Sequence, residues 1–198
     1  MKRFLTGAIL AIILVVAFLL REVNVYIFDV CIGVFTLFAT LEVSKLLAKG
    51  KKSNVLLPTL IYTTLAYLFI IVGMNNSMSL GKLFVGLVLM LVVLFIVVFA
   101  YYYLTKERTK LLIEVEGKNC KVSEYALNAS MNTVFNSLYP SLILLLLMFV
   151  NHFGEFSASL TKISAFNGAD IGLVVLLTIF VTSVFSDICA YFVGTIFG

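Results

Sequence analysis

The sequence has 198 residues, of which 62% are hydrophobic and 12% charged, with a formal net charge of +4 and a mean hydropathy of +1.14. Soluble domains are about half apolar and about a quarter charged, so this composition excludes an ordinary soluble enzyme. The chain is expected to be a multi-pass protein of the cell membrane, with the lipid bilayer as its surroundings. No nucleic-acid partner is expected.

Long unbroken apolar runs and only two prolines predict membrane helices rather than barrel strands. The expected fold is all-α, a polytopic transmembrane helical bundle of about six spans in a single membrane domain, residues 1–198. The expected spans are Phe4 to Leu20, Val23 to Leu47, Val55 to Met74, Leu83 to Leu104, Leu138 to Phe153 (with a backward extension to Val122 left open) and Ile171 to Phe197. Each is close to the ~20 residues that cross a hydrocarbon core. No small-x-small cleavage pattern follows the first span, so it is expected to be retained rather than removed as a signal peptide.

The basic residues predict the orientation of these spans. With the N-terminus in the cytoplasm, 11 of the 14 basic residues fall in cytoplasmic segments and 3 on the other side. The first group is Lys2, Arg3, Lys45, Lys49, Lys51, Lys52, Lys106, Arg108, Lys110, Lys118 and Lys121, and the second is Arg21, Lys82 and Lys162. Because cytoplasmic loops are enriched in Lys and Arg, this asymmetry favours a cytoplasmic N-terminus.

A long polar stretch, Thr105 to Asn136, interrupts the apolar pattern. It is compatible with an interfacial helix, a hairpin loop or a half-buried helix. Its last part leads into Tyr139 and Pro140 through Asn128, Ser130, Asn132, Thr133, Asn136 and Ser137. Such a run indicates either a helix end that lines a cavity or an ordinary solvated loop, and the spacing alone favours the loop.

The last span contains Asp187. A carboxylate near the centre of a membrane helix costs about 3 kcal/mol on insertion scales, whereas a Leu gains only about half a kcal/mol. Its presence therefore predicts an ion, a substrate or a partner charge. A divalent cation such as Mg²⁺ is a suitable ligand, because Mg²⁺ is bound by a few carboxylates together with water and substrate phosphates.

Small residues follow one another at intervals of four in the same span: Thr182, Ser186, Ala190, Gly194 and Gly198. This spacing forms a shallow groove that either packs against another helix or leaves room for a phosphate-bearing ligand. It also allows two copies of the chain to pair, so a homodimer is among the expected assemblies. Tyr191 lies four residues after Asp187 and flanks the groove.

The residues Ser186-Asp187-x-x-Ala190-Tyr191-Phe192-x-Gly194-x-x-Phe197-Gly198 resemble the signature region of bacterial phosphatidate cytidylyltransferases (CDP-diacylglycerol synthases), which reads much like S-D-T-x-A-Y-F-x-G-x-x-F-G. Weaker likenesses are the segment from Glu42 to Gly50, similar to E-x-x-x-L-x-x-K-G, and Tyr139-Pro140 before an apolar helix. The resemblance is loose over the chain and specific only at the final motif.

The resemblance implies the transfer of a cytidylyl group from CTP to phosphatidic acid, with Mg²⁺, giving CDP-diacylglycerol and pyrophosphate. It implies that Asp187 is catalytic and holds the metal, and that Ser186, Tyr191, Gly194 and Gly198 contact substrate. In the family the motif continues into basic loops and paired aspartates, which would follow Gly198. The chain is therefore expected to correspond to the N-terminal two-thirds of such an enzyme and to be inactive by itself.

An alternative from another class is a small transporter or channel subunit that uses Asp187 as an ion or proton site. Asp29 and Glu42, both in the second span, would then join it as pathway carboxylates. A third alternative is a non-catalytic membrane scaffold. His152 is expected to be an interfacial residue on the outer side. The three cysteines, Cys31, Cys120 and Cys189, form no CxxC or metal motif.

Overall fold

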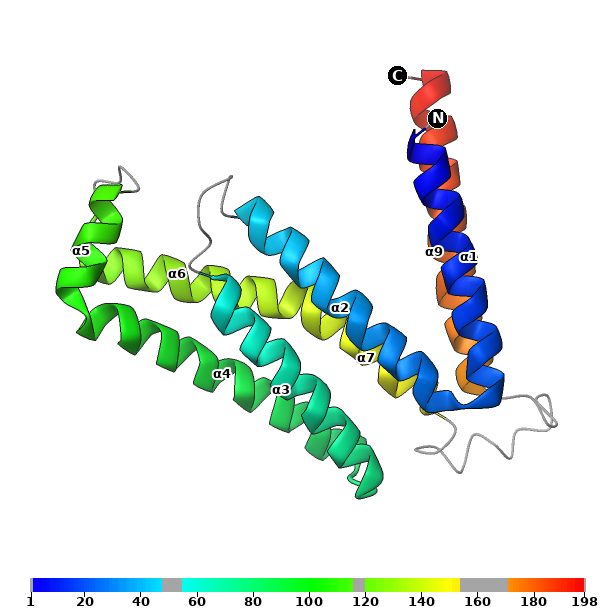
Figure 1. The fold of residues 1–198 in the computed structure, drawn as a ribbon, viewed down its shortest axis with the longest axis horizontal. Coiled ribbons are helices and arrows are strands. Elements are labelled where there is room, and N and C mark those ends of the chain that lie inside the picture. Colours follow the sequence, from blue (N-terminus) through cyan, green and yellow to red (C-terminus); the bar gives the residue numbers. More distant parts are fainter. Residues whose placement is uncertain (1, 48–54, 116–119, 154–170, 198) are drawn as a thin grey trace. The chain divides into compact units, whose positions relative to one another are not determined.

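The computed structural model describes residues 2–47, 55–115, 120–153 and 171–197. Its elements in chain order are α1 (Lys2–Val23), α2 (Val25–Leu47), α3 (Leu56–Asn75), α4 (Leu80–Leu104), α5 (Lys106–Val115), α6 (Val122–Asn136), the π-helical η1 (Ser137–Leu142), α7 (Ile143–Asn151) and α9 (Ile171–Phe197) (Figure 1). All of these described elements are helical, which confirms the all-α membrane bundle.

Each of the six expected spans coincides with a helix to within a few residues. Four helical runs among the described residues are long and apolar enough to cross a membrane: Val25–Leu47, Leu56–Asn75, Leu80–Leu104 and Val122–Asn151. Ile171–Ser186 is a shorter apolar segment. The backward extension of the fifth span to Val122 is confirmed, because α6, η1 and α7 follow one another without a break. The cytoplasmic position of the N-terminus stays a prediction.

The fifth span changes direction at η1. Pro140 lies inside this segment, and Tyr139 has non-helical backbone angles of φ −122° and ψ 115°. A proline inside a helix removes one backbone hydrogen bond and crowds the preceding turn, so a kink here has an identifiable cause.

Two compact units divide the chain: Met1–Val30 with Leu146–Gly198, and Cys31–Leu145. We call them the terminal unit and the central unit and describe each separately. The expectation of a single membrane domain stays a prediction.

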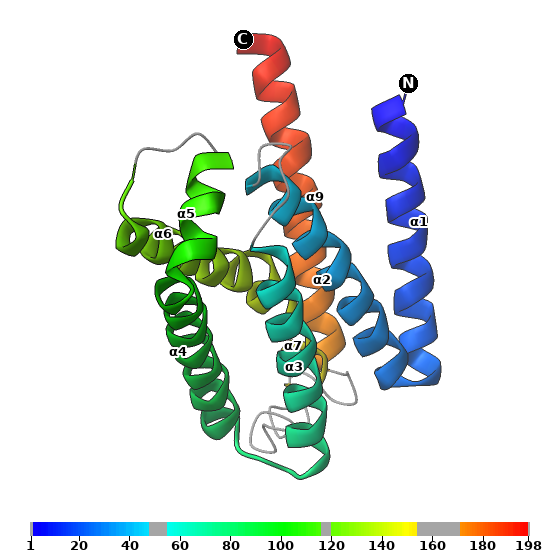
Figure 2. The same cartoon turned by 60° about the vertical axis from the view of Figure 1, so that its left-hand side comes forward.

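In the central unit α3 and α4 form a hairpin, and α4 also packs along α6 (Figure 2). Close approach within the hairpin depends on Gly86, where an added Cβ would lie 2.5 Å from Cζ of Phe69. A second close approach joins α2 to α3 at Gly33, where a Cβ would lie 2.7 Å from Cε2 of Tyr67. Small residues that let helices approach closely are typical of membrane bundles, where van der Waals packing holds helices together.

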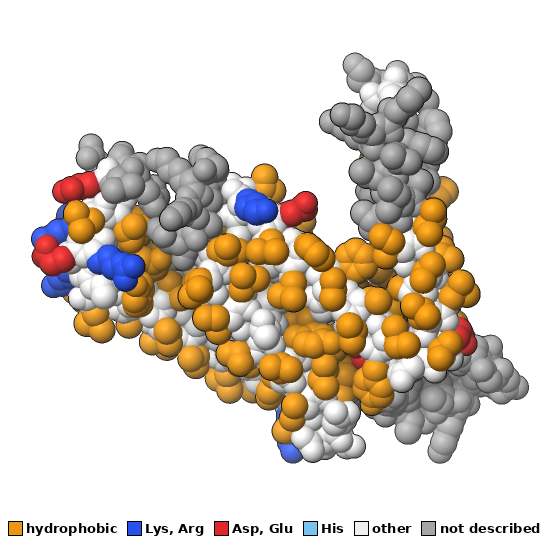
Figure 3. All heavy atoms as spheres, viewed as in Figure 1, with side chains coloured by type: hydrophobic (Ala, Val, Ile, Leu, Met, Phe, Trp, Pro, Cys, Tyr) orange, Lys and Arg blue, Asp and Glu red, His pale blue; other side chains and the backbone are white. Residues whose placement is uncertain are grey.

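The short helix α5 folds back onto α4 and α6. Its Ile113 joins a buried cluster with Val98, Tyr102, Tyr125, Ala126 and Ala129. The hydroxyl of Thr109 donates to the carbonyl of Tyr102 at 2.8 Å. The opposite side of α5 carries exposed charged side chains, and Figure 3 shows them gathered at this end of the unit, beyond the hydrophobic surface of the longer helices. Three structures were compatible with Thr105 to Asn136, and α5 is the half-buried helix among them.

Candidate functional site

The family-like motif lies on α9. Ser186, Asp187, Tyr191 and Gly194 all fall within this helix, whereas Gly198 lies outside the described residues. On a continuous helix, residues four apart share a face, so Ser186 and Gly194 are on the side predicted to carry the small-residue groove. The structure thus bears out the helical spacing on which the prediction of the groove depends.

Open space surrounds the described part of this groove. Ser186 is exposed, and a Cβ added at Gly194 would meet no atom within 4 Å. The side chains of Asp187 and Tyr191 lie outside the described residues, so their predicted roles stay predictions. A ligand at the groove would find a hydroxyl at Ser186 and no bulky side chain at Gly194.

The first half of α9 is held by α1. The rings of Phe18 on α1 and Phe180 on α9 meet edge to face, with their centroids 5.5 Å apart. Phe18 also contacts Phe28 on α2, at 5.2 Å. Leu176 on α9 is fully buried. The helix that carries the motif is therefore packed against α1 at Phe180, and its described side chains from Val181 onward are exposed.

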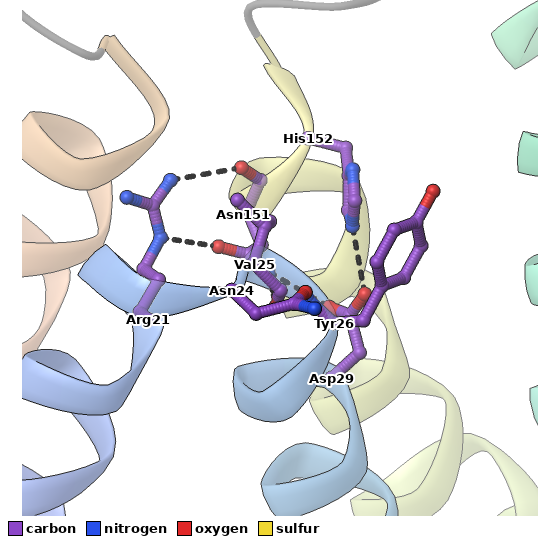
Figure 4. A network of polar contacts seen from close by, with 7 residues as sticks. All are labelled: Arg21, Asn24, Val25, Tyr26, Asp29, Asn151 and His152. Atoms are coloured by element: carbon purple, nitrogen blue, oxygen red, sulfur yellow. Dashed lines mark hydrogen bonds and ion pairs between the residues drawn. The ribbon is translucent and has the colours of Figure 1, made fainter.

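A charged network, Arg21, Asp29, Asn151 and His152, lies inside the terminal unit (Figure 4). All four side chains are buried, with exposed fractions between 1% and 3%. Asn24, between α1 and α2, accepts a hydrogen bond from the Tyr26 amide at 2.9 Å and caps the start of α2. The chain reversal brings Arg21, at the end of α1, and Asp29, in the first turns of α2, to the same end of α7.

Asn151 connects the members of this network. Its Nδ2 donates to Asp29 Oδ1 at 2.8 Å and to the carbonyl of Val25 at 3.2 Å. Its Oδ1 accepts from Nε of Arg21, and its backbone carbonyl accepts from Nη2 of Arg21 at 3.1 Å. Both amide hydrogens and the amide oxygen of Asn151 are therefore used.

The second oxygen of Asp29 lies 2.7 Å from Nε2 of His152. The Tyr26 ring packs on the imidazole at a centroid distance of 5.4 Å. A buried carboxylate is tolerated when it is paired and hydrogen-bonded, and Asp29 has a partner at each oxygen. The network explains the presence of Asp29 in an apolar helix without an ion or a substrate.

His152 is buried inside the terminal unit, where it pairs with Asp29. Its predicted place at the outer membrane interface stays a prediction. Glu42 is exposed, so the two carboxylates of α2 lie in different surroundings. The sequence signal for the network was Asp29 itself, since an intramembrane carboxylate calls for a partner, but nothing in the spacing identifies Arg21 or Asn151 as that partner.

The polar run before Pro140 is helix, and the favoured prediction of a solvated loop is wrong. At its end, Asn136 and the residues of η1 lie against hydroxyl groups of α2 and α3. We call this set of buried polar residues from α2, α3, α6 and η1 the hydroxyl seam: Thr36, Thr40, Ser44, Thr59, Thr63, Asn136, Ser137 and Ser141, each at most 1% exposed. Intervals of four, from Thr36 to Ser44 and from Thr59 to Thr63, place these residues on one face of each helix, a signal that the sequence analysis missed.

No three His, Cys, Asp or Glu side chains gather into a possible metal site within the part of the chain that the structure describes. Asp187 has a carboxylate, the kind of oxygen ligand that Mg²⁺ prefers, and Ser186, its neighbour in the sequence, has an exposed hydroxyl. A single carboxylate suits Mg²⁺ when substrate phosphates and water complete the coordination. A Mg²⁺ site at Asp187 stays a prediction.

Comparison with known families gives one match. The model of a cytidylyltransferase family matches residues 1–198. No curated protein and no solved structure matches the chain.

Proposed function

This chain belongs over residues 1–198 to the cytidylyltransferase family, whose enzymes are CTP-using nucleotidyltransferases, and we propose that its acceptor is phosphatidic acid. The products are then CDP-diacylglycerol and pyrophosphate. The observation that carries the proposal is the motif on α9, where Ser186 is exposed and a Cβ added at Gly194 would meet no atom within 4 Å. The membrane helices favour a lipid acceptor over a soluble one, since such an acceptor resides in the same bilayer.

In the proposed reaction a phosphate oxygen of phosphatidic acid attacks the α-phosphorus of CTP. A new P–O–P bond forms, the bond between the α- and β-phosphates breaks, and pyrophosphate leaves. Catalysis of this kind depends mainly on positioning and on neutralising charge. Bound Mg²⁺ would supply charge neutralisation on the phosphates. Asp187 would hold the cation, Ser186 and Tyr191 would offer hydroxyls, and Gly194 and Gly198 would leave room for the phosphates.

The charged network supports this proposal because it weakens the alternative of a transporter or channel subunit. A proton or cation pathway needs carboxylates that are open to the moving ion. Asp29 is 1% exposed and engaged by Asn151 and His152. The transporter alternative therefore loses one of its three carboxylates to a structural role.

The acceptor is tested with membranes that contain the protein. CTP labelled at the α-phosphorus should pass its label into the chloroform-extractable lipid when phosphatidic acid and Mg²⁺ are present. CTP labelled at the γ-phosphorus should yield only water-soluble pyrophosphate. Replacing phosphatidic acid by diacylglycerol is the matched control and should give no labelled lipid. Transfer to another acceptor, with none to phosphatidic acid, would contradict the lipid assignment while leaving the cytidylyltransferase activity intact.

A further inference from the structure

Three hydroxyls at the centre of the hydroxyl seam make more hydrogen-bonding contacts than they have protons. Ser141 Oγ lies 2.8 Å from Thr40 Oγ1, 3.1 Å from Thr63 Oγ1 and 3.1 Å from the carbonyl of Asn136. Thr40 and Thr63 are also within 2.8 Å of the carbonyls of Thr36 and Thr59. These three hydroxyls have one proton each and five acceptor contacts between them. None has a proton left for a further acceptor.

Two oxygens in the same seam have no partner. They are Oδ1 of Asn136 and Oγ of Ser137, and both residues are 0% exposed. The Asn136 amide is engaged on its other side, where Nδ2 donates to Oγ of Ser44. An amide oxygen accepts and cannot donate, so Oδ1 of Asn136 needs a donor, and Thr40, Thr63 and Ser141 have no proton to spare.

These orphan oxygens are costly where they lie. A buried polar group without a hydrogen bond costs about 1 to 3 kcal/mol in proteins, and the bilayer offers no solvent to replace the missing partner. Buried polar groups in native proteins are bonded to protein or to ordered water in the large majority of cases. Two adjacent residues with orphan oxygens at the start of the kinked segment η1 therefore point to a ligand.

The chemistry of the seam selects the ligand. It must donate to Asn136 Oδ1, and it can accept from the Ser137 hydroxyl. All eight residues of the seam are uncharged, and a cation buried without a negative partner is strongly disfavoured. A water molecule is neutral and both donates and accepts, and buried waters typically make about three hydrogen bonds.

We propose that the seam holds ordered water at the junction of α6 and η1, bonded to Asn136 Oδ1 and Ser137 Oγ. This water site is independent of the motif on α9 and of the reaction proposed for it. It lets a span with a proline kink keep a polar interior inside the membrane, as irregular membrane segments do when water completes their bonding.

Solid-state NMR of the 198-residue chain in lipid bilayers tests this site. Magnetisation should pass from water protons to the side-chain amide nitrogen of Asn136 at short mixing times. The exposed Asn76 serves as the positive control, and the buried Asn151, whose side-chain amide is fully bonded to protein, serves as the matched negative control. Transfer to Asn136 as slow as that to Asn151 would overturn the proposal.

A pair of serine variants gives an independent measurement. Ser137→Ala should lower the melting temperature in lipid, because the water loses one of its partners. Ser130→Ala is the matched control: its hydroxyl is equally buried and donates to the carbonyl of Ala126 at 2.7 Å within α6. Its loss should leave the water signal at Asn136 unchanged, whereas Ser137→Ala should weaken it. A melting temperature that rises in Ser137→Ala, as expected when an orphan hydroxyl is removed from a dry site, would contradict the proposal.

Discussion

Two buried asparagines, Asn151 and Asn136, show that the two units differ in how their buried polar side chains are hydrogen-bonded. Asn151 lies among charges and uses its whole side-chain amide, with Arg21 on its oxygen and Asp29 and Val25 on its nitrogen. Asn136 lies among neutral hydroxyls and uses only its nitrogen. The terminal unit therefore buries charge and pairs it, whereas the central unit buries dipoles and leaves two of them for a ligand. Removing a single partner should thus be far more damaging in the terminal unit.

The largest effect is expected at Asp29. Asp29→Asn removes the negative charge of a buried carboxylate that is bonded to Asn151 and His152. Removal of one charge from a buried network of this kind costs about 3 to 5 kcal/mol. The free energy of unfolding, measured in mixtures of SDS and mild detergent, should fall by this order. Glu107→Gln is the control: its carboxylate is 89% exposed and lies 3.5 Å from Lys110, and its loss should cost within about 0.5 kcal/mol. Equal effects of the two substitutions would show that the network does not hold the terminal unit.

The same substitution at the two asparagines gives the next largest difference. Leu has nearly the shape of Asn and no hydrogen-bonding groups. Asn151→Leu removes the side-chain bonds from Arg21 and to Asp29 and should cost about 3 kcal/mol, since bonds to charged groups are worth about 1.5 to 3 kcal/mol. Asn136→Leu removes one bond to Ser44 together with the orphan oxygen, and should cost about 1 kcal/mol. A larger loss in Asn136→Leu would reverse the comparison.

The smallest effect concerns single hydroxyls in α3. Thr63→Val removes the bond to Ser141 and should cost about 1 kcal/mol, the typical value of a buried hydrogen bond. Its neighbour Thr64 is exposed and donates only to the carbonyl of Leu60 in its own helix, at 2.9 Å. Thr64→Val should therefore be close to neutral. A shift of the unfolding midpoint in Thr64→Val as large as that in Thr63→Val would mean that the seam contributes nothing beyond helix propensity.

The helices were predictable from the sequence because the bilayer imposes their length. Apolar runs of about 20 residues gave α2, α3 and α4 nearly to the residue. The helical form of residues 122–136 was only one of several open predictions, since Ser, Thr and Asn compete for backbone hydrogen bonds and favour turns in an isolated chain. Packing against α4 overrides that preference, and it is a long-range effect that local spacing does not contain.

The motif on α9 and the charged network likewise differ in how far the sequence predicts them. The motif on α9 is contiguous, so its residues could be read directly. The charged network joins Arg21 to Asn151 over 130 positions, and His152 to Asp29 over 123. Periodicity on one helix carries no information about partners on another. Asp29 predicted that a partner exists, but only the structure shows that the partners are Asn151 and His152.

Asp187 and Asp29 have different proposed roles, and one paired measurement tests the difference directly. Asp187→Asn and Asp29→Asn are made in the protein, and both the rate of cytidylyl transfer and the melting temperature are measured on the same detergent preparations. Asp187→Asn should lower the rate by orders of magnitude, because a metal that neutralises phosphate charge is worth several kcal/mol, and should leave the melting temperature nearly unchanged. Asp29→Asn should lower the melting temperature and keep the rate per folded molecule near that of the unaltered enzyme. An active Asp187→Asn enzyme, or an inactive Asp29→Asn enzyme of normal stability, would contradict the account.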